Sequence, residues 1–187
     1  ENCKKINNVR IYRHNALRNC ANRHLIDTKK QDGTLSTAPV TLEARLHDTD
    51  TSLKRIDLRI VGSNYDNAVG MDYDFAITAL TEAKLNKIER DRPAIKNEVM
   101  RATEEPSSAV SDHIVWNRER QKIIKYRNTK YAFRPLIITT GGTMNHYFKT
   151  FIKDGLKGNG TRFKRECSAI LVKYNAMLYP TELRNYS

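Results

Sequence analysis

Three short segments between residues 40 and 80 alternate apolar and polar side chains, and this period of two is typical of β-strands with one buried face. The segments cover residues 40–46, 54–61 and 72–80. Residues 62–70 contain Gly-Ser-Asn and Asp-Asn, so we expect a hairpin connection that makes the second and third strands neighbours. An apolar, β-branched run over residues 133–140, followed by two glycines, predicts a fourth and buried strand.

Helical patterns surround these strands. We predict a first helix over residues 8–25, a loop over 29–39, a helix over 111–127 with Ser111 as its N-cap, and two final helices over 144–156 and 163–178. Residues 81–90 and 94–103 also allow helix, with a linker-like stretch after them at 104–110. This order predicts a single α/β domain over residues 1–187, a sandwich whose central mixed sheet of about four strands is flanked by helices.

The net charge is +12, from 33 Lys+Arg and 21 Asp+Glu, and the charges are unevenly placed. Bases predominate over residues 1–32, 117–135 and 149–173, whereas acids outnumber bases over residues 41–100. A basic frame around an acidic centre suits a metal-dependent enzyme that acts on nucleic acid, with phosphate contacts outside and metal ligands inside. The alternative is solvated surface charge, which is the more common explanation of any single charge cluster.

Missing patterns exclude several other classes. The apolar stretches are too short to cross a bilayer and residues 1–10 lack the apolar core of a secretory signal, so we expect a globular protein in a reducing compartment. Cys3, Cys20 and Cys167 form no CxxC pair and the five histidines form no HxH or HxxxH pair, which argues against a zinc catalyst. A P-loop and a nucleophile elbow are absent. Because the chain starts on Glu1 rather than methionine, we expect a fragment of a longer protein.

Asp57 and Asp74 stand on the polar faces of the second and third predicted strands. A hairpin between these strands would set the two carboxylates on adjacent strands. Such a pair can hold one or two Mg²⁺ ions, which polarise a scissile phosphate and activate water, and Glu43 on the first strand could join it. The alternative is a pair of strand carboxylates in solvent, with Arg59 as a neighbour.

Lys122 and Lys125 lie three residues apart in the predicted helix, so we expect both on one side, with Ile123 and Ile124 on the buried side. An ammonium group near a metal site could stabilise the charge of a phosphorane, whereas the alternative is an ordinary amphipathic helix with lysines in water. Tyr126 would pack in the core or stack on a sugar or base.

The basic run Arg13-His14-Asn15 lies in the first predicted helix. His14 could contact phosphate, although a lone histidine on a helix is more often structural. Each of these motifs alone is weak evidence for a family. The run Arg13-His14-Asn15 is informative mainly because of its position in the order of the motifs.

Taken in order, these motifs resemble those of one family. Over about residues 3–178 the chain resembles the restriction-like endonuclease domain of site-specific non-LTR retrotransposon polyproteins, a branch of the PD-(D/E)XK nucleases. The matching residues are Arg13, His14 and Asn15 for the RHN motif, Asp57 and Asp74 for the two acids, Lys122, Lys125 and Tyr126 for the KxxKY motif, and Phe133-Arg134-Pro135-Leu136 running into Gly141-Gly142. Two positions depart from the family: Ile56 replaces its proline, and Ala76 replaces the lysine that follows the second acid. Activity would therefore depend on a lysine from the later helix.

The resemblance implies a restriction-endonuclease-like fold and a Mg²⁺- or Mn²⁺-dependent endonuclease that nicks target DNA, exposing a 3′ hydroxyl to prime reverse transcription in the nucleus. It makes Asp57 and Asp74 the metal ligands, Lys122 and Lys125 the catalytic lysines, and Arg13, His14, Asn15 and Tyr126 the nucleic-acid contacts. The expected partner is DNA, with the parent element's RNA as a second candidate and no membrane. Residues 1–7 would be the remnant of an upstream zinc knuckle, without bound zinc, and residues 160–187 a C-terminal helical extension.

Two other functions stay open at this point. A catalytically degenerate nuclease fold would only bind nucleic acid, with the salt dependence of phosphate contacts and no metal-dependent cleavage. A Holliday-junction or repair nuclease of the same superfamily would share the chemistry and differ in its substrate, so that cleavage of branched against linear DNA would distinguish it.

Overall fold

The computed structural model describes residues 2–35, 38–46, 55–62, 70–80 and 106–178. The helices predicted over 81–90 and 94–103, and most of the connection over 62–70, lie outside the described residues. The strands are β1 (Val40–Arg45), β2 (Arg55–Val61), β3 (Gly70–Thr78) and β4 (Ala132–Thr139). The helices are α1 (Asn2–Gln31), α4 (Pro106–Lys125), α5 (His146–Thr150), a π-helical turn (Phe151–Gly155), a 3-10 turn (Lys157–Asn159) and α6 (Gly160–Leu178).

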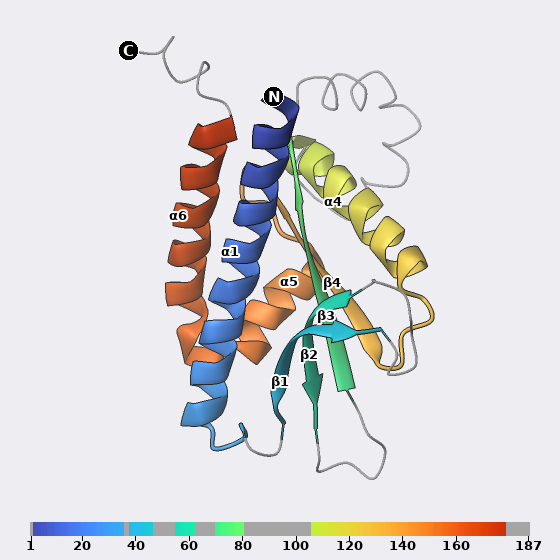
Figure 1. Ribbon diagram of the computed structural model, residues 1–187, viewed down its shortest axis with the longest axis vertical. Coiled ribbons are helices and arrows are strands. Elements are labelled where there is room, and N and C mark those ends of the chain that lie inside the picture. The colour runs from blue at the N-terminus through green and yellow to red at the C-terminus, as the bar shows by residue number, and fades with distance from the viewer. Residues whose placement is uncertain (1, 36–37, 47–54, 63–69, 81–105, 179–187) are drawn as a thin grey trace.

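The four strands form one mixed sheet in the order β1-β2-β3-β4. β2 pairs antiparallel with both β1 and β3, and its pairing with β3 agrees with the expected hairpin connection. β4 runs parallel to β3. A parallel neighbour needs a crossover connection, and α4 lies in the chain between β3 and β4. The expected fold class, α/β with a four-stranded mixed sheet flanked by helices, is therefore confirmed (Figure 1).

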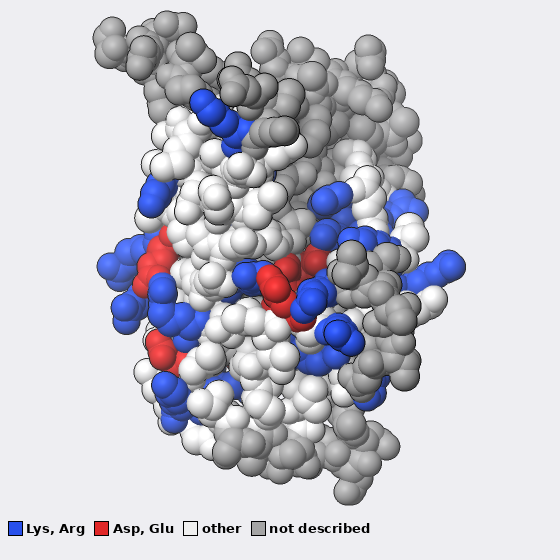
Figure 2. Space-filling model, viewed as in Figure 1, with Lys and Arg blue, Asp and Glu red and all other residues white. Residues whose placement is uncertain are grey.

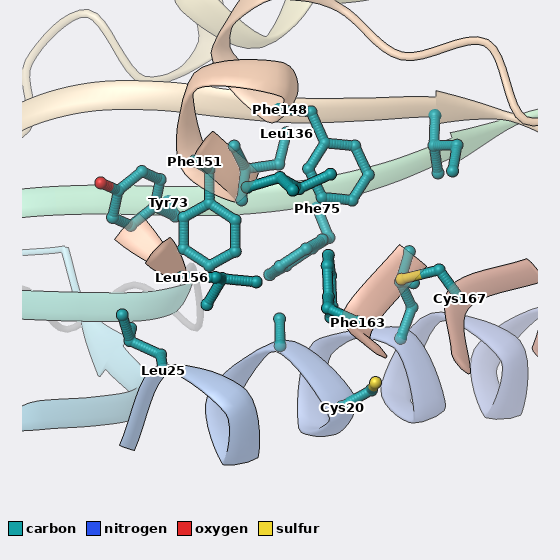
Figure 3. Packing of buried hydrophobic residues seen from close by; sticks show 14 of the residues in the cluster. Cys20, Leu25, Tyr73, Phe75, Leu136, Phe148, Phe151, Leu156, Phe163 and Cys167 are labelled. Carbon is teal, nitrogen blue, oxygen red and sulfur yellow. The ribbon is translucent and has the colours of Figure 1, made fainter. Parts of the chain in front are cut away.

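The larger core lies on the sheet face that α1, α5 and α6 cover, and α1 and α6 run side by side (Figure 1). Phe75 of β3 packs there with Phe148, Phe151 and Phe163, whose rings meet mainly edge to face (Figure 3). The opposite face is covered by α4, where Val115 packs on Ala76. The alternation predicted for β3 thus sends its aromatic residues to one layer and the side of Asp74 and Ala76 to the other.

Several predicted helix boundaries are wrong. α1 extends beyond residues 8–25 at both ends, and its last turn contains Lys29 and Lys30, whose charge stabilises the carbonyl end of a helix. α4 begins at Pro106 instead of after Ser111, because the fixed φ of proline suits a first helical turn. The helix predicted over 144–156 starts at His146, where the Asn145 side chain caps it, and changes to π-helix at Phe151. Among the described residues, no helix has both the length and the apolar character to cross a membrane.

Candidate active site

Asp57 of β2 and Asp74 of β3 meet where the hydrogen-bond ladder between the two strands ends. The last recorded pair is Leu58 with Tyr73, and the same register continued by one position sets Asp57 opposite Asp74. Beyond this pair a side chain accepts the hydrogen bond from a backbone N–H of β3: Asp57 Oδ2 accepts from the Phe75 N–H at 2.6 Å. Asp57 is 9% and Asp74 5% exposed, so the alternative of two carboxylates in open solvent is wrong.

Asp74 is held by two side chains of the α4 segment. The Lys122 ammonium donates to its Oδ2, and the Tyr126 hydroxyl donates to its Oδ1 at 3.1 Å. Both donors reach one carboxylate because residues four apart on a helix lie on the same side. Burial raises the pKa of Asp74, Lys122 opposes that shift, and the nearby charge of Asp57 adds to it. The two carboxylates are therefore close enough to repel each other.

The inward side of α4 differs from the prediction. Ile123 and Ile124 were expected to be buried, yet Ile124 is 63% exposed, and the mostly buried side chain is that of Lys122. Lys125 is exposed, with its ammonium 4.7 Å from the centre of the Tyr126 ring, so the two lysines do not share one environment. Lys122 can be buried because its ammonium pairs with the buried carboxylate of Asp74. The inward side of α4 therefore carries a lysine where apolar residues were expected.

Tyr126 has a different surrounding from the one expected of a nucleic-acid contact. It is 3% exposed and its ring packs on Phe133 with the centroids 4.7 Å apart, so no face is open to a base. Burial and the charge of Asp74 raise the pKa of its hydroxyl, which keeps it a hydrogen-bond donor at neutral pH. The prediction that Tyr126 contacts nucleic acid is therefore corrected: it positions Asp74.

α1 contributes to the site through consecutive residues that point to different sides. The Nε2 of His14 lies 3.1 Å from Asp57 Oδ1, whereas Arg13 is buried and donates to Asn175 of α6 at 2.6 Å. Asn15 is half-buried and does not line the cavity that the other two border. Successive helical residues turn by about 100°, so a three-residue motif on α1 cannot present all its side chains to one site.

Glu43 does not join the carboxylate pair through a hydrogen bond that the structure records. It lies on β1 beside the pair of Ala44 with Ile56, and its carboxylate accepts from Arg18 of α1. Arg59, considered as a neighbour of Asp57, is instead bound to Asp72 through two hydrogen bonds of 2.7 and 3.0 Å. Glu43 and Arg59 are thus each paired with an oppositely charged residue other than Asp57 or Asp74.

A cavity of about 480 Å³ opens beside the carboxylate pair, and His14 and Lys122, which contact the two carboxylates, belong to its lining. Its lining comes from three elements: Arg10, Arg13 and His14 of α1, Arg118 and Lys122 of α4, and residues 75–79 at the end of β3. Figure 2 shows one face of the molecule, where acidic side chains lie near the middle with lysines and arginines around them. Arg10 and Arg118 were missed in the sequence, although each stands one helical turn before a singled-out residue, His14 and Lys122.

The carboxylate pair suits a hard divalent cation. Each of the four oxygens has one protein donor, and a carboxylate oxygen can accept a second interaction. Mg²⁺ and Mn²⁺ prefer oxygen ligands, and Mg²⁺ is commonly held by one or two protein carboxylates, with water and substrate as its other ligands. A cation would also offset the repulsion that contributes to the raised pKa of Asp74.

The site therefore unites residues of α1, β2, β3 and α4 around two buried carboxylates and one ammonium group. Asp57, Asp74, Lys122 and His14 come together, while Asn15 and Lys125 lie outside that group. In comparisons with known proteins, no family model matches this chain and no curated protein matches it.

Proposed function

We propose that this chain is a Mg²⁺- or Mn²⁺-dependent endonuclease that cleaves DNA. The observation that carries the proposal is the buried pair of Asp57 and Asp74 on adjoining strands, with the Lys122 ammonium at Asp74. Two carboxylates side by side in a buried site repel each other, and a cation relieves this. Burial raises the pKa of Asp74, and a buried carboxylate of raised pKa beside a cavity is a common feature of catalytic sites.

Asp57 and Asp74 would hold the divalent ion. When bound, such an ion polarises the scissile phosphate and lowers the pKa of a water molecule that attacks it. Tyr126 fixes the orientation of Asp74 through its hydroxyl, and His14 contacts Asp57. Lys122 borders the cavity, so its ammonium can donate to a phosphate oxygen as negative charge develops there.

The lining of the cavity favours a polyanionic substrate. Arg10, Arg13 and Arg118 border it together with Lys122, and phosphate contacts by such groups supply most of the sequence-independent affinity for DNA. Ala76, which stands where the family has a lysine, lines the same cavity, and the ammonium at the second acid comes from α4. This supports the expectation of a lysine borrowed from the later helix. As the resemblance implies, the nick would prime reverse transcription for a retrotransposon in the nucleus.

The test is nicking of supercoiled plasmid in Mg²⁺ and, separately, in Mn²⁺. We expect the natural chain to produce open circles, and Asp57→Asn and Asp74→Asn to lose this activity. Asp154→Asn is the matched control, since Asp154 is an exposed aspartate in the π-helical turn. Undiminished nicking by either site variant would refute the assignment. Branched and linear DNA assayed side by side would separate a junction resolvase from a target-nicking enzyme.

A second candidate, a module that only binds nucleic acid, is favoured by one observation. Lys122 and Tyr126 already satisfy Asp74, and His14 and the Phe75 N–H satisfy Asp57, so the cluster holds its shape through protein contacts alone. Such a module would bind DNA with a steep salt dependence and leave plasmid supercoiled at every divalent ion tested.

A further inference from the structure

A second cluster of ligand atoms lies between α1 and α6. Cys20 and His24, one helical turn apart on α1, face Glu166 of α6. One ligand atom from each, a sulfur, an imidazole nitrogen and a carboxylate oxygen, lies within 4.8 Å of the other two. We propose that these three side chains bind one Zn²⁺ ion that joins α1 to α6. This site is separate from the Asp57 and Asp74 pair and does not depend on the proposed nuclease activity.

The separations fit a tetrahedral zinc ion. Cys20 Sγ lies 3.4 Å from Glu166 Oε2, and His24 Nε2 lies 3.3 Å from Glu166 Oε1. Zinc bonds of about 2.3 Å to sulfur and about 2.0 Å to nitrogen or oxygen place tetrahedral ligands about 3.3–3.5 Å apart. The two distances end on different oxygens of the Glu166 carboxylate, so a rotation of that group would bring one oxygen to the ion.

His24 gives an independent indication of a missing ligand. Its ring is 2% exposed, in edge contact with Phe163, and within the described residues its Nε2 has no hydrogen-bond partner. The approach to Glu166 at 3.3 Å lacks hydrogen-bond alignment. A buried polar atom without a partner destabilises the folded state. A metal bond at Nε2 would satisfy this atom.

The donor types select zinc over magnesium. Thiolate and imidazole ligands suit Zn²⁺, whereas Mg²⁺ takes oxygen ligands. Glu166 adds a carboxylate oxygen to the thiol and the imidazole. Arg23 and Arg162 also contact Glu166, both through exposed side chains that contribute little to holding it.

Cys167 is the candidate for the fourth ligand. It follows Glu166 on α6 and is buried in the same core as Cys20. With Cys167 the site would be closed and structural; without it, water would occupy the fourth position. In either case the ion holds α1 against α6. Six residues, about 9 Å of helix, separate Cys20 from His14, so the same ion would steady the part of α1 that reaches Asp57.

The test measures metal content and ligand type directly. The full chain, kept reduced and freed of metal, is titrated with Zn²⁺ and with Co²⁺. We expect one ion per chain and, with Co²⁺, the near-ultraviolet charge-transfer absorption of a thiolate bond. Cys20→Ser should remove that absorption and weaken zinc binding at least about 100-fold, since even indirect ligand partners contribute about 10–100-fold. Cys3→Ser and Asp57→Asn are the controls that should retain one zinc per chain.

Folded natural protein that takes up no zinc, or shows no thiolate absorption with Co²⁺, would overturn the proposal. So would a Cys20→Ser variant with unchanged zinc affinity. If Cys20→Ser fails to fold, Glu166→Gln serves in its place, because Glu166 is partly exposed. Zinc binding without Mg²⁺-dependent nicking would refute the nuclease alone, and nicking without zinc binding would refute this site alone.

Discussion

The two clusters of possible metal ligands in this chain differ in whether their buried polar atoms have hydrogen-bond partners. At the carboxylate pair, Lys122 and Tyr126 donate to Asp74, and His14 and a backbone N–H contact Asp57. At the cluster between α1 and α6, the Nε2 of His24 has no hydrogen-bond partner among the described residues. The first cluster is complete as a protein network and can accept a metal in addition, whereas the second leaves an atom that a metal would satisfy.

The clusters also differ in hardness and in the elements that build them. Strands supply two carboxylates to the first, and helices supply sulfur, nitrogen and oxygen atoms to the second. Hard oxygen sites exchange Mg²⁺ readily and suit catalysis on phosphate, whereas sulfur and nitrogen sites bind zinc tightly and suit structure. One chain would therefore use two metals for two purposes, and each difference can be tested separately.

The largest expected effect separates the clusters by activity. If the proposed function holds, Asp74→Asn should lower the rate of plasmid nicking at least about 1000-fold, because it would remove one of the two proposed metal ligands. The same preparation should retain one zinc ion per chain. Nicking rate and zinc content are measured on the same sample. Loss of both properties together would show that the two clusters are not independent.

The next effect distinguishes the two lysines. Lys122→Met should reduce the single-turnover nicking rate about 100-fold, since its ammonium lies at Asp74 and borders the cavity. Lys125→Met should change it less than about threefold, because Lys125 is exposed over the Tyr126 ring. Saturating protein removes any difference in DNA affinity. A larger loss in Lys125→Met would reverse the assignment.

A smaller effect, on stability, belongs to the zinc cluster. In the absence of Mg²⁺, a chelator should lower the free energy of unfolding by about 2.7 kcal/mol relative to protein with free zinc at about 100 times its Kd. Denaturant titration of both samples measures this difference. For Cys20→Ser the chelator should change the free energy of unfolding by no more than about 0.4 kcal/mol, because its zinc affinity is at least about 100-fold weaker. Asp57→Asn should respond as the natural chain does. A chelator response retained in Cys20→Ser would contradict the ligand assignment.

The smallest expected effect tests the network around Asp74. Tyr126→Phe keeps the ring packed on Phe133 and removes only the hydroxyl that donates to Asp74. We expect a loss of about 1 kcal/mol in the free energy of unfolding, with nicking reduced less than about tenfold and zinc binding unchanged. Denaturant titration and the plasmid assay measure the two quantities. Full loss of nicking would indicate a direct role for the hydroxyl in the reaction.

Strand patterns predicted much of the fold and part of the site. Alternation predicted the polar faces of Asp57 and Asp74, because a side-chain period of two assigns each residue to a face, and the expected hairpin predicted that their strands are neighbours. Helix patterns were less informative, since the spacing of Lys122 and Lys125 suggested a common environment that the structure does not give them. Ile124 is exposed and Tyr126 is buried, because the side of this helical segment that faces inward is set by its contacts with Asp74 and Phe133.

The sequence by itself determined the alternating strands, the mixed α/β order, the charge distribution and the two acidic candidates. These depend on local periodicity and composition, which act over a few neighbouring residues. Only the tertiary structure decided that Lys122 and Tyr126 would meet Asp74, and that Glu166 would meet Cys20 and His24. Those contacts join residues far apart in the chain, and they form because the sheet and the packing of α1 on α6 bury polar groups that must then find partners.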